Sequence, residues 1–216
     1  MTLPERLAAY NTPEGALEYL DEYEKAHRKL SDKRERRLLE GYFERIGQVD
    51  TILDLPCGFG RYLPFLSRHG KSVAQSDWSK DMLVLGRKLY GEDAALGRFR
   101  ALGHQMPLAD GTVEVSFSMR LNHHLVDPLV RRGHIEELFR ISSCWTIFSY
   151  FDYNSLKNLG RRVRYRCGST IRRKNTMLRR EVHDLARTAG FKIVCDPMLF
   201  VIGSGHRLVL AERSKS

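Results

Sequence analysis

Residues 52–62 read Ile-Leu-Asp-Leu-Pro-Cys-Gly-Phe-Gly-Arg-Tyr, an apolar run that ends in a glycine-rich turn. The apolar run is typical of a buried parallel strand. It ends where Gly58 and Gly60 allow backbone conformations that other residues rarely adopt. We expect a helix at roughly residues 61–66, with its unpaired N–H groups directed at the turn. This stretch therefore predicts the first strand of an open α/β sheet, with a ligand lying against bare main chain.

Two carboxylates follow neighbouring strands of this predicted sheet. Asp54 lies at the end of the first strand, and Asp77 closes the next apolar run, residues 72–76. The carboxyl ends of parallel strands meet at the crevice in which open α/β sheets bind ligands. The pair of acids predicts a ligand that carries an amine and a ribose diol.

The stretch resembles the first motif of the class I S-adenosylmethionine-dependent methyltransferases, in which an acid is followed by alternating glycines. Asp54, Gly58 and Gly60 match that motif, and Pro56 stands in place of its first glycine. Proline fixes φ and has no N–H, so this position can need neither a positive φ nor a donor. The rival interpretation, a nicotinamide dinucleotide fold, requires glycine where this chain has Leu63.

The resemblance extends over about residues 51–212 and implies a fold and a cofactor. The fold is a Rossmann-like α/β sheet of seven mostly parallel strands, with the last strand antiparallel and helices on both faces. The cofactor is S-adenosylmethionine, with S-adenosylhomocysteine as product. Leu102 replaces the acid that usually meets adenine, which leaves recognition to backbone groups and apolar contact. The implied cofactor-binding residues are Asp54, Pro56, Cys57, Gly58, Gly60, Asp77, Trp78, Met82, Leu102, Gly103 and Met119.

Candidate acceptor residues follow the fourth and fifth predicted strands, residues 113–118 and 144–151. His123 is the candidate general base, because imidazole titrates near neutral pH. The alternative is an imidazole bonded to backbone. Arg120 is a candidate partner for an acidic substrate group, and Tyr153 is expected at the substrate mouth. No Asn-Pro-Pro-Tyr-like motif and no Pro-Cys follows the fourth strand, which argues against adenine-nitrogen and cysteine-dependent pyrimidine methylation.

Apolar residues at helical spacing predict a helical cap over residues 1–50, and the resemblance implies a methyltransferase domain over residues 51–216. In the resembling enzymes such a helical segment often covers the cofactor, which makes Tyr19, Tyr23 and Arg28 candidate cofactor contacts. The four cysteines lack zinc-ligand spacing, so no metal is expected. No signal peptide and no apolar run of about 18 residues is present, which predicts a cytoplasmic protein without a transmembrane segment. The oligomeric state is not indicated.

The net charge of +10 lies in one segment. Residues 157–180, which we call the basic segment, contain ten Lys or Arg and no Asp or Glu. One interpretation is a solvated loop or short helix. The other is a lid or insertion at about residues 155–180 that attracts anions, because arginine grips phosphate or carboxylate through two bonds. An anionic membrane surface is a further partner, with peripheral localisation, since each basic residue contributes about 1 kcal/mol there.

These features predict methyl transfer to an oxygen or nitrogen of a small or amphiphilic acidic molecule, such as a phosphorylated sugar or a lipid or glycolipid intermediate. A first alternative is a tRNA or rRNA methyltransferase that uses the basic segment on phosphates, although aromatic residues for base stacking are few there. A second alternative is a non-catalytic cofactor-binding protein, which the replacement of the family's acid by Leu102 keeps open.

Overall fold

The computed structural model describes residues 10–24, 26–168, 170, 174–200 and 204–214, with the side chains of residues 22–29 left out. Within these ranges a seven-stranded sheet has the order β3-β2-β1-β4-β5-β7-β6. The strands are β1 (Val49–Asp54), β2 (Gly70–Asp77), β3 (Gly97–Arg100), β4 (Val113–Ser118), β5 (Ser142–Phe151), β6 (Phe191–Cys195) and β7 (His206–Arg213). The helices are α2 (Pro13–Glu24), α3 (Ala26–Ile46), α4 (Leu63–Leu66), α5 (Lys80–Tyr90), η1 (Asn122–His124), α6 (Pro128–Ile141), α7 (Leu156–Arg166) and α8 (Arg179–Thr188).

The sheet confirms the predicted fold class. Strands β3, β2, β1, β4 and β5 pair in parallel, and β7 runs antiparallel to both β5 and β6. Sequential order reverses between β1 and β4, because β2 and β3 lie on one side of β1 and the later strands lie on the other. In open α/β sheets such a switch point forms a crevice at the carboxyl ends of the strands. The fold therefore places the ends of β1, β2 and β4 around one crevice.

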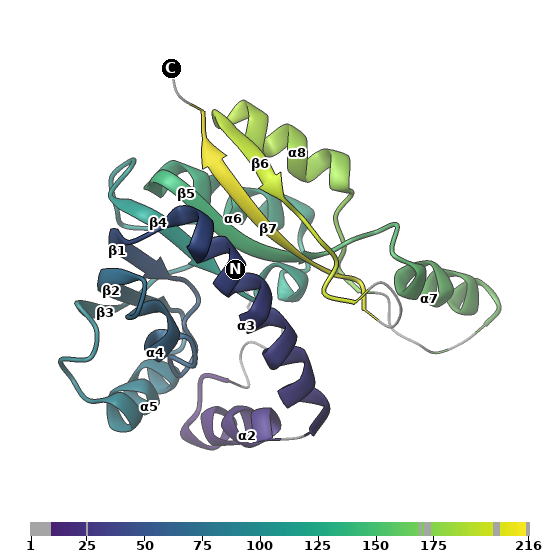
Figure 1. The fold of residues 1–216 in the computed structure, drawn as a ribbon. Helices are drawn as coiled ribbons and strands as arrows, with labels where there is room; N and C mark the ends of the chain where they lie inside the picture. The colour runs from purple at the N-terminus through teal and green to yellow at the C-terminus, as the bar shows by residue number, and fades with distance from the viewer. Residues whose placement is uncertain (1–9, 25, 169, 171–173, 201–203, 215–216) are drawn as a thin grey trace.

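Alternate residues of each strand face two separate apolar layers, as the period of two in a strand requires. Leu53 packs with residues of α6 and α8 on one face of the sheet. Ile52 packs with Leu39 and Phe43 of α3 and with α4 on the other face. Figure 1 shows α6 and α8 behind the sheet and α3 crossing its front. The sheet is thus covered on both faces, which leaves its carboxyl edge as the place for a ligand.

Two elements differ from the sequence prediction. The helix expected at residues 61–66 is only Leu63–Leu66, because successive turns occupy residues 57–62, with Gly60 N–H bonded to the Cys57 carbonyl. Pro64 in its first turn also lacks an N–H. From its apolar residues the sequence predicts a third strand at residues 99–102. The strand lies at Gly97–Arg100, because Leu102 leaves the sheet and forms a bridge with Gln105. In both cases local turns replaced regular structure that apolar spacing alone suggested.

The N-terminal helices pack as part of the same structure. The apolar face of α3 enters the second core layer, and α2 lies beside α5 at the edge of the crevice (Figure 1). The division into residues 1–50 and 51–216 stays a prediction. Helix α7 projects from the body, apart from the sheet (Figure 1). Among the described residues, no helix combines the length and the apolar character needed to cross a membrane.

Candidate cofactor and substrate site

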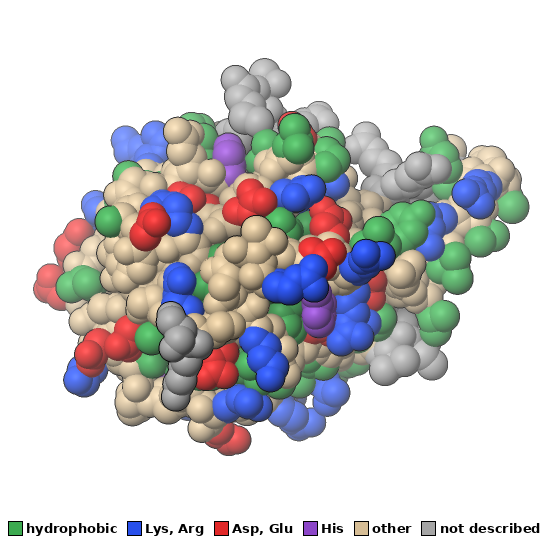
Figure 2. Space-filling view, turned by 90° about the horizontal axis from the view of Figure 1, so that it is seen from above, with side chains coloured by type: hydrophobic (Ala, Val, Ile, Leu, Met, Phe, Trp, Pro, Cys, Tyr) green, Lys and Arg blue, Asp and Glu red, His purple; other side chains and the backbone are tan. Residues whose placement is uncertain are grey.

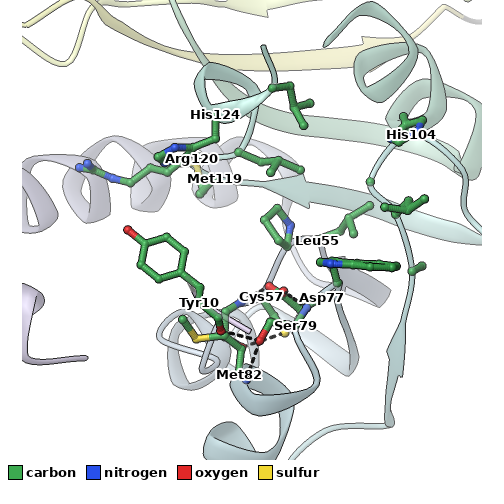
Figure 3. Close-up of a pocket in the computed structure, with 18 of the residues that line it drawn as sticks. Tyr10, Leu55, Cys57, Asp77, Ser79, Met82, His104, Met119, Arg120 and His124 are labelled. Atoms are coloured by element: carbon green, nitrogen blue, oxygen red, sulfur yellow. Dashed lines mark hydrogen bonds between the residues drawn. The ribbon is translucent and has the colours of Figure 1, made fainter. Parts of the chain in front are cut away.

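A cavity of about 670 Å³ opens at the carboxyl ends of β1, β2 and β4. Its volume lies within the range of about 300–1,000 Å³ that is usual for small-molecule sites. In Figure 3, Asp77, Ser79 and Met82 lie on one side of it, with Met119, Arg120 and His124 opposite. Ten of the predicted site residues line the cavity: Pro56, Cys57, Gly58, Asp77, Trp78, Met82, Leu102, Gly103, Met119 and Arg120.

The glycine turn needs its two glycines for the reason the sequence suggested. Gly58 has φ 55° and Gly60 has φ 84°, both in the left-handed region that disfavours side chains. Pro56 follows a cis peptide bond and is not among the residues with positive φ. Helix α5 approaches the turn closely, since a Cβ on Gly86 would lie 3.0 Å from the Phe59 carbonyl oxygen. A glycine on α5, unrecognised in the sequence, therefore permits the close packing behind the turn.

Asp77 fastens the turn to the start of α5. One carboxylate oxygen accepts the Gly58 N–H at 2.8 Å, and the other accepts the Ser79 N–H at 2.8 Å. Burial raises the pKa of Asp77 to about 6. Each carboxylate oxygen can accept a second hydrogen bond. The residue can therefore hold the wall of the cavity and still receive hydroxyl donors from a ligand.

Asp54 and Gly60 lie behind the cavity wall. The Asp54 carboxylate is buried, and burial raises its pKa to about 8. Its Oδ2 lies 3.4 Å from the Gln75 amide nitrogen, and its Oδ1 has no hydrogen-bond partner among the described residues. An unsatisfied buried acceptor of this kind indicates a missing donor, such as a ligand amine or a water.

The part of the wall expected to meet adenine is largely apolar. The Leu102 carbonyl accepts the Gln105 N–H, and the Gly103 carbonyl accepts from His134 Nδ1 at 2.6 Å. Burial lowers the pKa of His134 to about 4, so its neutral ring donates there and accepts from Ser118 through Nε2. Trp78 Nε1 is buried without a partner in the described part of the chain. Each of these two carbonyls thus accepts one hydrogen bond and keeps a second lone pair, and the Trp78 N–H is a further polar group on this apolar wall.

The predicted acceptor residues are not brought together. His123 is not on the cavity wall: its ring stacks on Phe151 at 4.3 Å, and burial, followed by the neighbouring His124 and His206, holds its pKa well below the usual value. The neighbouring His124 lines the cavity instead. Tyr153 lies in a second cavity beside α7. The roles of these residues stay predictions.

A buried ionic network, missed in the sequence, joins α3 to the cavity. Glu35 accepts from Arg120, from Arg61 at 3.2 Å and from the Tyr62 hydroxyl at 2.8 Å. Burial alone would raise the pKa of Glu35, but Arg120, His206 and Arg61 hold it well below the usual value. The helical spacing held a signal, since Glu35 precedes Leu39 by one turn on the apolar face of α3.

Arg120 and Arg61 line the cavity while they pair with this network. Arg120 also has φ 64°, an uncommon conformation for a residue other than glycine. Such backbone conformations cluster at functional sites. Of the candidates in the N-terminal helices, Tyr19 lines the cavity, and Tyr23 and Arg28 lie outside the described side chains. Further lining residues that the sequence did not suggest are Tyr10, Ser79, Leu121, Leu125, Val126, Asp127, Pro128 and Val130.

The structure bears on two further kinds of chemistry, nucleophilic attack by a thiol and metal binding. Burial raises the pKa of the Cys57 thiol well above its usual value, so it is not a nucleophile at neutral pH. No cluster of three or more His, Cys, Asp or Glu side chains with metal-binding geometry occurs in the described ranges.

Comparisons with known proteins agree with the fold. The family model described as a methyltransferase domain matches residues 53–142, which run from β1 to the start of β5. The structure of magnesium protoporphyrin IX methyltransferase from Synechocystis PCC 6803, with bound S-adenosylhomocysteine, superposes with a TM-score of 0.69 at 16% identity, over 88% of each chain. A protein from Pyrococcus horikoshii gives 0.67 at 18% identity, over 88% of this chain and 92% of that one.

A third similar structure is a geranyl diphosphate methyltransferase in complex with its substrate and sinefungin, with a TM-score of 0.59 at 15% identity, over 83% of this chain and 76% of that one. No curated protein matches the sequence. At identities this low, the similar structures show the fold alone. The family model shows a methyltransferase domain over residues 53–142, so the chain has the fold of S-adenosylmethionine-dependent methyltransferases and contains a segment that matches a methyltransferase domain.

Proposed function

We propose that the cavity at the carboxyl ends of β1, β2 and β4 binds S-adenosylmethionine, and that the enzyme methylates an oxygen or nitrogen of a small or amphiphilic acidic molecule. A phosphorylated sugar or lipid intermediate is the acceptor class that we favour. The observation that carries the proposal is the glycine turn, held by Asp77, in the wall of a 670 Å³ cavity at the switch point of the sheet.

The donor set fits this cofactor. Asp77 keeps free lone pairs for ribose hydroxyls, and Asp54 holds an unpartnered oxygen for a donor from the amine, direct or through water. Trp78, Met82 and Leu102 give apolar surface for the adenine. When bound, the cofactor supplies a sulfonium methyl that is already activated. The chain then has to align the acceptor and exclude water, and alignment can supply much of the rate.

The remaining wall suits an amphiphilic acceptor. Leu121, Leu125 and Val130 give apolar surface that excludes water, whereas Arg61 and Arg120 bring positive charge that Glu35 partly balances. A protonated acceptor needs a base, and we propose His123 for it, although its ring stacks on Phe151 beside the cavity and must turn to reach an acceptor there. Its loss should then lower kcat by about 10²-fold or more. A His123→Ala variant that transfers methyl at the wild-type rate would contradict this role.

Calorimetry with S-adenosylmethionine tests the cofactor assignment. Asp77→Ala should weaken binding at least tenfold, because the turn loses its anchor and the ribose loses its acceptor. Asp81→Asn, in the first turn of α5 and outside the cavity, is the control. Equal affinity of Asp77→Ala and the wild type would refute the assignment.

The acceptor class is tested by incubating the protein with methyl-labelled cofactor and fractionated cell extract. Label should enter small acidic molecules or lipids. Label in RNA would overturn our choice and favour the RNA methyltransferase alternative. Cofactor binding without any transfer of label would favour a non-catalytic binding protein.

A further inference from the structure

A second cavity, of about 340 Å³, lies beside α7 and is unusually basic. Its described lining holds five cationic side chains and neither Asp nor Glu. Three cations come from α7, one comes from the start of α6, and one comes from residues 174–176. The lining residues are Arg131, Tyr153, Asn158, Arg161, Arg162, Arg166, Lys174, Asn175 and Thr176.

The three cations that α7 contributes to this cavity have no acidic partner among the described residues. None of the ion pairs there involves Arg161, Arg162 or Arg166. The pKa of Arg161 is lowered by burial and then by the charge of Arg164. The nearby Asp152 is buried and is already paired with Arg207 at 2.7 Å. Cations gathered in this way repel one another, so a bound anion would relieve the repulsion.

The lining offers donors in a form that suits phosphate. Guanidinium groups are planar and bind phosphate oxygens through two bonds. Arg162 lies over the Tyr153 ring, with its Cζ 3.8 Å from the ring centroid, and it also donates to the Tyr153 carbonyl. Arg161 donates to Asn158 at 3.5 Å, a weak contact. Arg162 is thus held in place, whereas Arg161 is free to turn towards a ligand.

A shared wall connects this cavity with the first. Arg131 donates to the carbonyls of Leu125 and Val126 at 2.6 and 2.8 Å, and Asn175 donates to the His123 carbonyl at 3.0 Å. The other side of the same loop lines the first cavity through Leu121, Leu125 and Val126. A molecule that placed an anionic group beside α7 would therefore lie next to the proposed methyl-transfer site.

Apolar surface adjoins the cations on α7. Leu156, Leu159 and Val163 are 62%, 46% and 53% exposed and recur at helical spacing. Blue basic and green hydrophobic side chains occur together on the projecting part of the molecule at the right of Figure 2. Surface of this mixed kind matches a ligand that carries both a phosphate and an apolar group.

We propose that the cavity lined by Arg161, Arg162, Arg166 and Lys174 binds the phosphate or diphosphate group of the methyl acceptor. The inference rests on the proposed function for its role in the reaction, but the anion site itself can be tested alone. The phosphate can belong to a soluble molecule or to a lipid headgroup, and the chemistry of recognition is the same.

The test is a calorimetric titration of the full chain with inorganic pyrophosphate at fixed ionic strength. Arg166→Gln and Arg161→Gln should each weaken binding about tenfold, because each removes a charge-assisted hydrogen bond. The matched control is Arg164→Gln, which removes the same charge from the same helix outside the cavity lining. Thermal unfolding of each variant checks that it is folded.

The source of the phosphate is tested with vesicles of phosphatidic acid in phosphatidylcholine. Sedimentation with these vesicles that is lost in Arg166→Gln, kept in Arg164→Gln and competed by pyrophosphate supports a lipid headgroup. Pyrophosphate binding without sedimentation supports a soluble phosphorylated molecule. Equal losses in Arg164→Gln and Arg166→Gln would indicate diffuse attraction and overturn the site, as would no binding to either probe.

Binding of S-adenosylmethionine, measured on the same variants, separates this inference from the proposed function. Arg166→Gln should bind the cofactor as the wild type does, since Arg166 does not line the first cavity. If the wild type binds the cofactor but not pyrophosphate, the anion site alone is wrong. Absence of cofactor binding in the wild type sinks the proposed function and leaves the pyrophosphate result standing.

Discussion

One carboxylate oxygen of Asp77 accepts a hydrogen bond from the glycine turn, and the other accepts one from the start of α5. Burial raises the pKa of Asp77 to about 6. Ionised, it can accept ribose hydroxyls. Protonated, it loses an acceptor and its grip on the two N–H groups weakens. Cofactor affinity should therefore fall as the pH is lowered through about 6. Calorimetry between pH 5 and 8 measures this, and Asp77→Asn should be weak throughout. Affinity that is constant over the range would contradict the assignment.

Asp54 makes the stability of the fold depend on pH. Burial raises its pKa from the usual 3.8 to about 8, so the folded state holds a proton that the unfolded state has already released. Between about pH 4 and pH 8 the free energy of unfolding should decrease as the pH rises, because the unfolded state binds fewer protons there.

Thermal unfolding of the cofactor-free protein across this range tests the prediction. Asp54→Asn should flatten the decrease, because an amide does not titrate. Asp50→Asn is the control, since Asp50 is an exposed residue of the same strand. A slope that is unchanged in Asp54→Asn would show that the buried carboxyl stays ionised.

Sequence reasoning found the residues whose role is local and missed those whose role depends on distant partners. Gly58, Gly60 and Asp77 follow from the turn and the strand end that they occupy. Arg120 has a positive φ and pairs with Glu35, which lies 85 positions away in the sequence. The residues next to Arg120 in the sequence do not encode that contact. His124, rather than His123, faces the cavity because the short η1 sets their directions, and the sequence did not predict η1.

Glu35 links helix α3 to the site through its buried ion pairs with Arg61 and Arg120. Glu35→Gln should destabilise the protein by about 3 kcal/mol or more, because Arg120 and Arg61 lose a buried counter-ion. Since the pKa of Glu35 is held below its usual 4.5, its contribution is present above that pH and lost as the pH falls through the lowered value.

Denaturant unfolding at pH 7 measures this loss. Glu40→Gln is the control on the same helix, where the exposed pair with Arg68 should contribute at most about 1 kcal/mol. Equal and small losses in the two variants would mean that the apolar face of α3, not the ion pair, holds the helix in place.

Other elements show where sequence patterns sufficed. Strand β4 matches its predicted bounds, and α5 begins after Ser79, whose hydroxyl accepts the Met82 N–H as a capping residue. Strand β3 and helix α4 were displaced or shortened, since both lie beside turns whose hydrogen bonds compete with regular structure. For the basic segment the sequence left loop and helix open. The Ser155 hydroxyl accepts the Asn158 N–H and caps the start of α7. A count of charges does not detect such a cap, so it could not predict this helix.

At the scale of the whole molecule, the first cavity draws its wall from Tyr10 and Tyr19 near the N-terminus, from β1, β2 and β4, and from the start of α6. A ligand there should couple segments that are distant in sequence. Cofactor at about 100 times its Kd should add about 2.7 kcal/mol to the free energy of unfolding. For a chain of this length, Tm should rise by about 5–10 °C.

Hydrogen exchange locates the coupling and separates the two cavities. S-adenosylmethionine should slow exchange in α2, because Tyr19 lies on the cavity wall, and should leave α7 unchanged. Pyrophosphate should do the reverse, because Arg161, Arg162 and Arg166 of α7 line the second cavity. If the cofactor slows exchange in both helices equally, the protein closes as one body and the loop at residues 121–126 transmits the effect. If it slows neither, the N-terminal helices do not cover the cofactor.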